Sequence, residues 1–161
     1  MNLSNARFSL DRSVPSETNV SNMATWDDVR RIALALPETD ERVARSGRQW
    51  RVHDKLFVWE RPLRPKEIEA LAEDAPDGPI LGARVEHIGA KEALLADGSG
   101  VFFTTPHFDG YPAILVRLDE ITVTDLDEVV TEGWLARASR RLVESYLGEP
   151  RRDSSQRRSP G

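Results

Sequence analysis

The N-terminal part of the chain carries apolar residues at helical spacing. Thr25 and Asp28 stand directly before this pattern, three residues apart, as in a helix-capping box. Pro37 follows the last apolar position and ends the helix. The sequence therefore predicts a helix with one core-facing stripe, formed by Trp26, Val29, Ile32, Ala33 and Leu36.

A second helical pattern runs from Thr124 to Gly148 near the C-terminus. Acidic residues follow Thr124 in the first turn, where they complement the helix dipole. Gly148 and Pro150 end the pattern. We expect one long helix with an apolar stripe formed by Leu126, Val129, Val130, Gly133, Trp134, Ala138, Leu142 and Tyr146.

Between these helices, residues 48–60 have the pattern of a β-hairpin. A tight turn at His53-Asp54 makes Val52 and Lys55 direct partners. Both faces of the hairpin mix polar and apolar side chains, so alternation does not identify the buried face. Arg48, Trp50, Val52, Lys55, Phe57 and Trp59 share one face, and Gln49, Arg51, Leu56 and Val58 share the other.

The remaining central segments are shorter. The last two predicted strands flank a loop that Pro106, Gly110 and Pro112 stiffen. Pro65 suits the first turn of a short helix. The predicted segments are a loop over 37–47, a helix over 66–72, a strand over 80–85, a helix over 90–96, and strands over 101–105 and 113–118.

This order of elements predicts an α+β fold. Because the helices do not alternate with the strands, we expect a two-layer sandwich with the N- and C-terminal helices on one face of an antiparallel sheet. The other face is then free or covered only by loops. We assign the domain to residues 23–148 and expect disordered tails at 1–22 and, rich in arginine, at 149–161. Met1 and Met23 are both candidate starts.

Composition narrows the possible functions. The 161 residues suffice for one domain with a core. The absence of cysteine excludes disulfides, thiolate catalysis and cysteine-ligated metals. The net charge of −5 argues against nonspecific phosphate binding but leaves room for a local basic patch. Without a membrane-spanning run or a signal peptide, we expect a cytoplasmic protein with no membrane contact.

Motifs for common enzyme chemistry are missing. The chain has no phosphate-binding loop, and the Gly-Ser-Gly at 98–100 lacks the flanks of a nucleophile elbow. His53, His87 and His107 lie in separate segments. A catalytic pair of His107 and Asp109 is conceivable, but such loop residues more often hold the loop together. We expect no catalytic residue, cofactor or bound metal.

Two groups of side chains are candidates for binding. His107, Phe108, Asp109 and Tyr111 lie on the stiff loop and form the edge of a binding surface. The hairpin offers basic and aromatic groups suited to nucleic acid, which the neighbouring strands extend. The alternative is that the aromatic side chains of the hairpin pack in the core, with its basic side chains along the rim of the core. This is the more common role for such aromatic residues. The hairpin candidates are Arg48, Trp50, Lys55, Phe57 and Trp59, with Arg84 and Arg117 from the strands.

Several segments resemble the MmcQ/YjbR family in the same order. They are Ala-Leu-Ala-Leu-Pro-Glu-Thr at 33–39, the hairpin segment 50–57, Phe-Phe-Thr-Thr-Pro-His-Phe-Asp-Gly-Tyr-Pro-Ala at 102–113, and Trp134. The resemblance covers about 23–147 and implies a sandwich similar to the frataxin/CyaY fold, a double-wing arrangement and DNA binding. Frataxin-like iron binding is not expected, because arginines follow the acids of the first helix.

Two functions are therefore open. The first is a non-enzymatic module that binds DNA or another nucleic acid through the hairpin and the 107–111 loop. The alternative is a module that binds a small molecule or a protein partner, with the loop 106–112 as a wall of its pocket.

Overall fold

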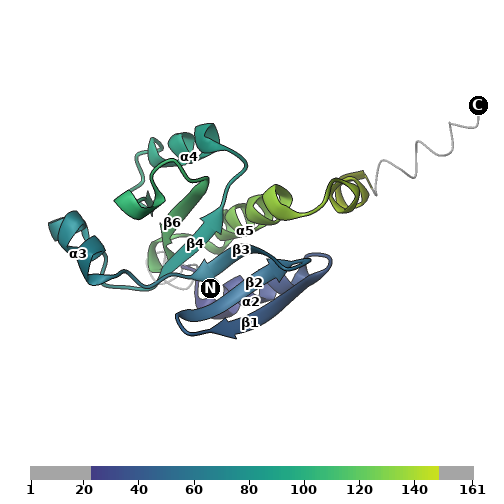
Figure 1. Cartoon of the computed structure of the whole chain (residues 1–161), viewed down its shortest axis with the longest axis horizontal. Helices are drawn as coiled ribbons and strands as arrows, with labels where there is room; N and C mark the ends of the chain where they lie inside the picture. The colour runs from purple at the N-terminus through teal and green to yellow at the C-terminus, as the bar shows by residue number, and fades with distance from the viewer. Residues whose placement is uncertain (1–22, 149–161) are drawn as a thin grey trace, which may run out of the picture.

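The computed structural model describes residues 23–148, which form a six-stranded antiparallel sheet and its covering helices (Figure 1). The tails predicted at 1–22 and 149–161 lie outside the described residues. The strand order in the sheet is β1-β2-β3-β4-β6-β5. The strands are β1 (Thr39–Ala44), β2 (Gly47–Val52), β3 (Lys55–Glu60), β4 (Ile80–Arg84), β5 (Phe102–Phe103) and β6 (Ala113–Arg117).

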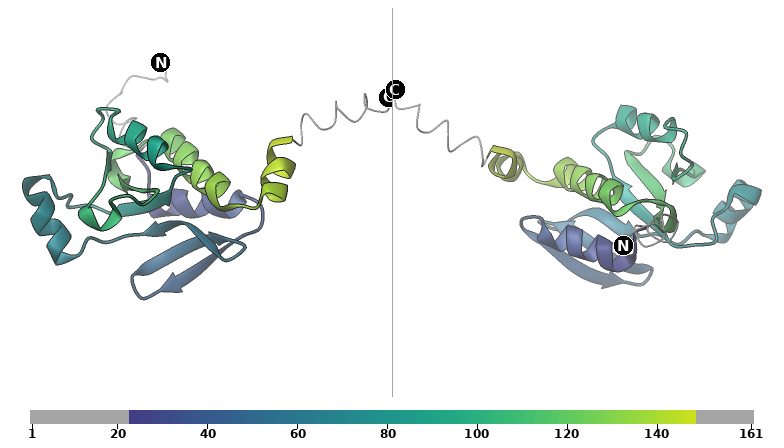
Figure 2. Two further views of the ribbon diagram at one scale, coloured as in Figure 1. Left: turned by 45° about the horizontal axis from the view of Figure 1, so that its top comes forward. Right: turned by 180° about the vertical axis from the view of Figure 1, so that it is seen from behind.

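The helical elements include two that pack on the same sheet face, as the sequence predicts. Helices α2 and α5 cover this face side by side (Figure 2). The two-layer α+β arrangement is thus confirmed. The α-helices are α2 (Trp26–Ala35), α3 (Pro65–Leu71), α4 (Ile88–Leu95) and α5 (Val123–Arg137), and the 3-10 turns are η2 (Ala72–Asp74), η3 (Pro106–Phe108) and η4 (Leu118–Glu120).

The start of α2 is the predicted capping box. The Thr25 hydroxyl accepts a hydrogen bond from the Asp28 amide at 3.3 Å, and the Asp28 carboxylate accepts one from the Thr25 amide at 2.9 Å. This exchange pairs amide groups that the first helical turn leaves without a backbone partner. It fixes the point at which the chain enters the helix layer.

The main core lies between the sheet and these two helices. Its fully buried members include Trp50, Phe57 and Trp134, and the Trp134 indole donates to the Pro37 carbonyl at 3.0 Å. Helix α5 approaches the sheet closely at Gly133, where an added Cβ would lie 3.0 Å from the Phe57 carbonyl oxygen. The small residue therefore sets the distance between the two layers.

A second, smaller core lies on the opposite face of the sheet. Leu63 and Leu71, before and within α3, pack against it, as does the turn η3 through Phe108. We expected this face to be free or covered only by loops. The segment that contains α3 packs against part of it instead. The members of this core are Trp59, Ile80, Phe103, Phe108, Ala113 and Leu115.

The predicted faces of the hairpin are only partly correct. The turn at His53-Asp54 and the Val52–Lys55 pair are confirmed, and both turn residues have positive φ. An irregularity opposite Trp50 and Arg51 inserts one extra residue into β3. Trp59 therefore pairs with Gln49 and moves to the second core, while Val58 pairs with Trp50 and joins Phe57 in the main core.

Two element boundaries also differ from expectation. The predicted loop over 37–47 contains the strand β1, which pairs with β2 along its whole length. Charged residues dominate this edge strand because most of its side chains meet solvent, so no apolar alternation marks it. The predicted long C-terminal helix is interrupted: α5 ends at Arg137 with Ala138 in an extended conformation, and a separate helical segment spans 140–148.

Within the described residues, no helix is long and apolar enough to cross a membrane.

Candidate ligand-binding groove

A groove of about 530 Å³ opens on the sheet face opposite α2 and α5. Its floor comes from β2 and β3, one wall is the 107–111 loop, and the other is the segment that leads into α3. Apolar, aromatic and polar side chains line it in similar measure. The lining residues are Ser46, Gln49, Leu56, Trp59, Arg61, Arg64, His107, Phe108, Asp109, Gly110 and Tyr111.

The floor of the groove depends on the contact between Trp59 and Gly82. A Cβ added to Gly82 would lie 2.4 Å from the indole carbon Cε2 of Trp59, so the ring occupies the space that any other residue would fill. Gln49 is the strand partner of Trp59 and places its side-chain amide beside the ring. The Gln49 amide oxygen accepts a hydrogen bond from Arg51 at 2.7 Å, which orients the amide within the floor.

The loop wall is held in place by Lys91 of α4. Its Nζ donates to the Phe108 carbonyl at 2.6 Å and to the Tyr111 carbonyl at 3.0 Å. Lys91 is only 4% exposed, and burial lowers the pKa of its ammonium group despite the opposing charge of Asp109. A buried lysine thus fixes the loop through its backbone, which leaves the side chains at 107, 109 and 111 directed outward.

The opposite wall is anchored by a buried ion pair. Arg61 donates to both carboxylate oxygens of Glu67, at 3.0 Å and 2.6 Å, and Thr105 donates to the same carboxylate at 3.3 Å. Burial alone would raise the pKa of Glu67, but hydrogen bonds from Arg61 and from the Arg64 amide outweigh it and hold that pKa below 4.5. The network joins α3 to Thr105, which lies between β5 and the 107–111 loop.

Aromatic rings and guanidinium groups meet along the loop wall. The Arg61 guanidinium lies 5.1 Å from the centre of the Phe108 ring, and both residues line the groove. The Arg84 guanidinium lies 4.9 Å from the centre of the Tyr111 ring and donates to the Tyr111 hydroxyl at 3.2 Å. Tyr111 is 44% exposed, so its ring presents one face to solvent while the other is supported by a cation.

A second, more apolar depression of about 500 Å³ adjoins the groove. It lies between α3 and the turn η3, and its lining includes Pro65, Ala70 and Pro106. Arg64 and His107 line both depressions, so they stand on the ridge between them. A ligand larger than the main groove has space to extend past this ridge.

The structure brings five of the predicted binding residues together in the groove. Trp59 contributes to the floor, and His107, Phe108, Asp109 and Tyr111 form the wall. His107 contacts the edge of the Phe108 ring, with 4.9 Å between ring centres. No hydrogen bond joins His107 to Asp109 in the described part of the chain, and Lys91 rather than this pair holds the loop.

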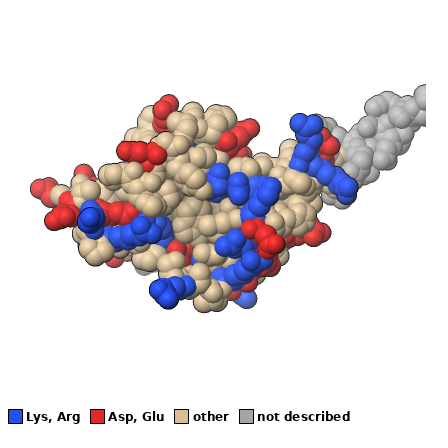
Figure 3. Space-filling model, in the orientation of Figure 1, with Lys and Arg blue, Asp and Glu red and all other residues tan. Residues whose placement is uncertain are grey.

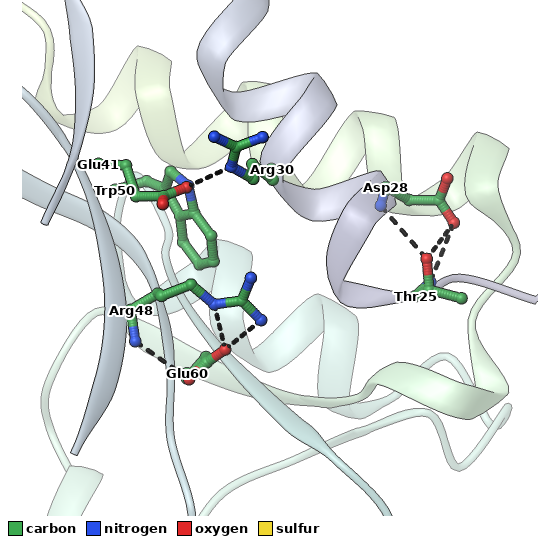
Figure 4. Close-up of polar contacts among 7 residues, drawn as sticks. All are labelled: Thr25, Asp28, Arg30, Glu41, Arg48, Trp50 and Glu60. Carbon is green, nitrogen blue, oxygen red and sulfur yellow. Dashed lines mark hydrogen bonds and ion pairs between the residues drawn. The ribbon is translucent and has the colours of Figure 1, made fainter. Parts of the chain in front are cut away.

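Arg48 and Trp50 are not part of this surface, which corrects the predicted basic and aromatic hairpin face. Trp50 is fully buried in the main core, and its indole donates to the Glu41 carboxylate at 2.9 Å. Arg48 is paired with Glu60 at 2.6 Å and lies 5.8 Å from the centre of the Trp50 ring. Figure 4 shows both side chains close to helix α2, on the sheet face away from the groove.

Lys55 and Arg117 also lie apart from the groove. Lys55 is exposed and follows the hairpin turn at the far end of β3. Arg117 lies on the groove side of the sheet, but it donates to the carbonyls of Gly100 and Asp74 and covers the Phe103 ring at 4.7 Å. Its guanidinium thus holds loops together at the other end of β6.

Several groove residues were missed from the sequence. Gln49 was assigned to the opposite face from Trp59 because the extra residue in β3 has no sequence signature. Arg61 and Arg64 lie between the predicted hairpin and the predicted helix over 66–72, in a segment to which no function was assigned. Lys91 is the only cation in α4, a helix that is mostly apolar apart from Lys91 and Glu92, and its burial is seen only in the structure.

Metal coordination has no support in the residues that the structure describes. Residues 23–148 contain no group of three or more histidine or acidic side chains arranged to hold a metal ion.

Comparison with known proteins identifies close relatives. Uncharacterized protein Mb2600 of Mycobacterium bovis and uncharacterized proteins MT2646 and Rv2570 of two Mycobacterium tuberculosis strains are each 55% identical to the chain over 128 residues. The match covers 78% of this chain and 97% of each relative. No model of a known protein family matches the chain, and neither does any solved structure. At this identity and coverage, the chain belongs to the same family as these mycobacterial proteins.

Proposed function

We propose that the protein is a non-enzymatic binding module that takes a small organic ligand in the groove beside the 107–111 loop. The observation that carries this proposal is the convergence of Trp59, Tyr111 and Gln49 on one concave surface. The groove volume of about 530 Å³ lies in the range typical of small-molecule sites. Aromatic rings supply apolar contact, and the Gln49 amide and the Arg64 guanidinium supply oriented polar groups.

The buried anchors on both sides support a preformed site. Lys91 fixes one wall and the Arg61–Glu67 pair fixes the other, so neither wall has to be ordered when a ligand enters. A preformed site avoids the entropy cost of ordering its own side chains. This supports binding as the role of the groove, and no nucleophile–base pair argues for catalysis among the described residues that line it.

A screen of small aromatic compounds followed by two-dimensional NMR tests the proposal. We expect shifts of the Trp59 indole, the Gln49 side-chain amide and the amides of 107–111. Tyr111→Ala should weaken binding, because it removes an exposed groove ring without opening the core. Val43→Ala is the matched control, since Val43 is exposed on the edge strand β1. Binding that maps elsewhere, or that Tyr111→Ala leaves intact, would contradict the proposal.

Nucleic-acid binding is the second candidate, as the resemblance to the MmcQ/YjbR family implies. The observation in its favour is the presence of several lysine and arginine side chains on the face shown in Figure 3, where acidic side chains are interspersed among them. Lys55 at the start of β3, Arg64 directly before α3 and Lys66 within α3 are exposed cations. Because Arg48 and Trp50 do not belong to an exposed basic and aromatic surface, nucleic-acid binding has less support than ligand binding in the groove.

An electrophoretic mobility shift with single- and double-stranded DNA distinguishes the candidates. Binding at low salt that Lys66→Gln and Arg64→Gln reduce would support the nucleic-acid function, because phosphate contacts carry most of such affinity. Absence of a shift at low salt would eliminate it. Residence in the cytoplasm is part of both proposals and is testable by cell fractionation.

A further inference from the structure

The polar residues that line the groove differ in whether they can donate or accept hydrogen bonds. Ser46 and His107 can do both, so they place no condition on a ligand. Gln49, Arg64 and Tyr111 also line the groove, and each has a side chain whose remaining hydrogen-bonding capacity favours donation. These three side chains therefore restrict the kind of ligand that the groove accepts.

The side-chain amide of Gln49 has its oxygen already engaged. Nη2 of Arg51 donates to this oxygen at 2.7 Å. A guanidinium group has no acceptor, so the atom of Gln49 that meets Arg51 must be the oxygen and not the nitrogen. The Gln49 amide nitrogen donates no hydrogen bond within residues 23–148. Gln49 therefore offers its two N–H donors to a ligand in the groove.

The Tyr111 hydroxyl is biased in the same direction. Nη1 of Arg84 donates to its oxygen at 3.2 Å, and the Arg84 guanidinium supports the Tyr111 ring. With a donor already on its oxygen, the hydroxyl keeps its own O–H proton for a second partner. Because Tyr111 is exposed and lines the groove, a ligand there can accept this proton.

Arg64 adds a positive charge to the lining. Its guanidinium can only donate hydrogen bonds. Several arginines of the domain have no carboxylate partner for their side chain within 23–148, and Arg64 is the one among them that lines the groove. Its backbone amide, rather than its guanidinium, donates to Glu67, at 2.9 Å. The exposed side chain on the ridge is therefore accessible to a ligand.

The carboxylates near the groove each have a cation of the protein to oppose them. Glu67 accepts both hydrogen bonds of Arg61, and this pair is buried. Asp109 lines the groove and acts on the buried ammonium group of Lys91: burial lowers the Lys91 pKa, and the charge of Asp109 opposes that decrease. The positive charge of Arg64 is the one in the lining that no carboxylate of the described residues contacts.

From these contacts we infer that the groove selects an aromatic carboxylate. The carboxylate accepts hydrogen bonds from donors of the lining, foremost the Gln49 amide nitrogen, and the charge of Arg64 favours it over a neutral acceptor. The aromatic ring lies against Trp59 and Tyr111. A carboxylate satisfies donors that an aromatic amine would leave unpaired. The inference rests on the proposed binding function and narrows its ligand from small organic compounds to aromatic acids.

Three probes with the same ring system test this selectivity: naphthoate, naphthamide and naphthylmethylamine. They carry a carboxylate, an amide in which an NH₂ group replaces one acceptor oxygen, and an ammonium group that only donates. Titration followed by two-dimensional NMR gives both the affinity and the site. We expect naphthoate to bind at least about tenfold more tightly than naphthylmethylamine, with naphthamide between them, because a hydrogen bond to a charged group contributes that much.

Gln49→Glu tests the floor of the groove. The glutamate keeps an oxygen for Arg51 and replaces the N–H donors by a second acceptor oxygen of nearly the same shape. Naphthoate affinity should fall about tenfold or more, and naphthylmethylamine affinity should stay or rise. Lys55→Gln is the matched control, because it changes the net charge by the same amount at an exposed position apart from the groove. It should keep the wild-type order of affinities.

Arg64→Gln tests the charge at an exposed position whose side chain the fold does not require. It should weaken the binding of naphthoate and leave that of naphthamide unchanged, because only naphthoate is an anion. This variant keeps the inference testable if Gln49→Glu lowers the thermal midpoint. Unchanged naphthoate affinity in Arg64→Gln would contradict the contribution of this charge.

The possible results separate this inference from the proposed binding function. Equal binding of the three probes in the groove, or a preference for naphthylmethylamine through Asp109, would overturn the inference and leave the groove proposal standing. A loss of naphthoate affinity in Lys55→Gln equal to that in Gln49→Glu would also overturn it, because the effect would then be general electrostatics. If no probe shifts the Trp59 indole or the amides of 107–111, both proposals are refuted.

Discussion

The indole of Trp59 lies directly over Gly82 on the neighbouring strand, in the volume that a side chain at position 82 would occupy. This contact lets a large aromatic ring lie flat enough on the sheet to form the floor of the groove. Its geometry gives a direct way to change the floor without altering any polar group.

Gly82→Ala should therefore destabilise the protein and weaken groove binding. The added methyl group would overlap the Trp59 ring at 2.4 Å, and such overpacking costs about 1–3 kcal/mol. The gain from restricting the unfolded chain is smaller, about 0.4–1 kcal/mol, so destabilisation wins. Urea denaturation measures the change. Gly148→Ala is the control, since nothing lies within 4 Å of its added Cβ, and an equal loss there would refute the explanation.

Lys91→Met should loosen the loop wall. The substitution keeps the apolar stem but leaves the Phe108 and Tyr111 carbonyls without their donor, at a cost on the order of 2 kcal/mol. We expect faster amide hydrogen exchange at 107–111 and weaker ligand binding. Lys55→Met, at an exposed position, should change neither property. Unaltered exchange in the loop of Lys91→Met would show that the loop is held by other contacts.

The Arg61–Glu67 pair should make the protein sensitive to acid. Because the folded state holds the pKa of Glu67 below 4.5, the pair contributes stability at pH values above 4.5, and this contribution is lost as the pH falls through the folded pKa. Glu67→Gln should cost about 3–5 kcal/mol at neutral pH, since it leaves Arg61 buried without a counter-charge.

The pH dependence itself separates this explanation from a packing effect. Stability curves of Glu67→Gln should fall less steeply below pH 4.5 than those of the wild type. Glu69→Gln, on the exposed face of α3, should retain the wild-type slope. Parallel curves for wild type and Glu67→Gln would mean that Glu67 does not carry the acid sensitivity.

Arg48→Gln should separate stability from binding. The side chain is partly exposed, so loss of its pair with Glu60 should cost only about 1 kcal/mol. Ligand affinity should stay unchanged because Arg48 lies on the other face of the sheet from the groove. Tyr111→Ala should show the reverse, with affinity lost and stability nearly retained. Reduced affinity in Arg48→Gln would restore the predicted hairpin surface as a binding face.

Local signals made much of the fold predictable. The Thr25–Asp28 capping box, the turn at His53-Asp54 and the proline at the start of α3 involve residues close in sequence, so their patterns reflect their contacts directly. The helix pair on one sheet face followed from element order alone. The loop residues of the groove were found because aromatic and polar side chains stand between prolines that fix the backbone.

Nonlocal contacts explain what the sequence left unpredicted. The extra residue in β3 exists because Phe57 and Val58 both enter the main core, which depends on the helices packed there. Strand β1 is defined by its pairing with β2 rather than by its own composition. Lys91 and Glu67 meet partners 17 and 38 residues away, at Phe108 and Thr105, and no spacing rule relates them.

The extra residue in β3 also gives the chain a built-in spectroscopic reporter. All four tryptophans lie in the described part of the chain. Trp26, Trp50 and Trp134 belong to the main core or pack against it. Trp59 alone lies on the groove face of the sheet, in the second core. Its intrinsic fluorescence is therefore the part of the emission that a groove ligand can quench, and the difference spectrum between wild type and Trp59→Phe isolates it.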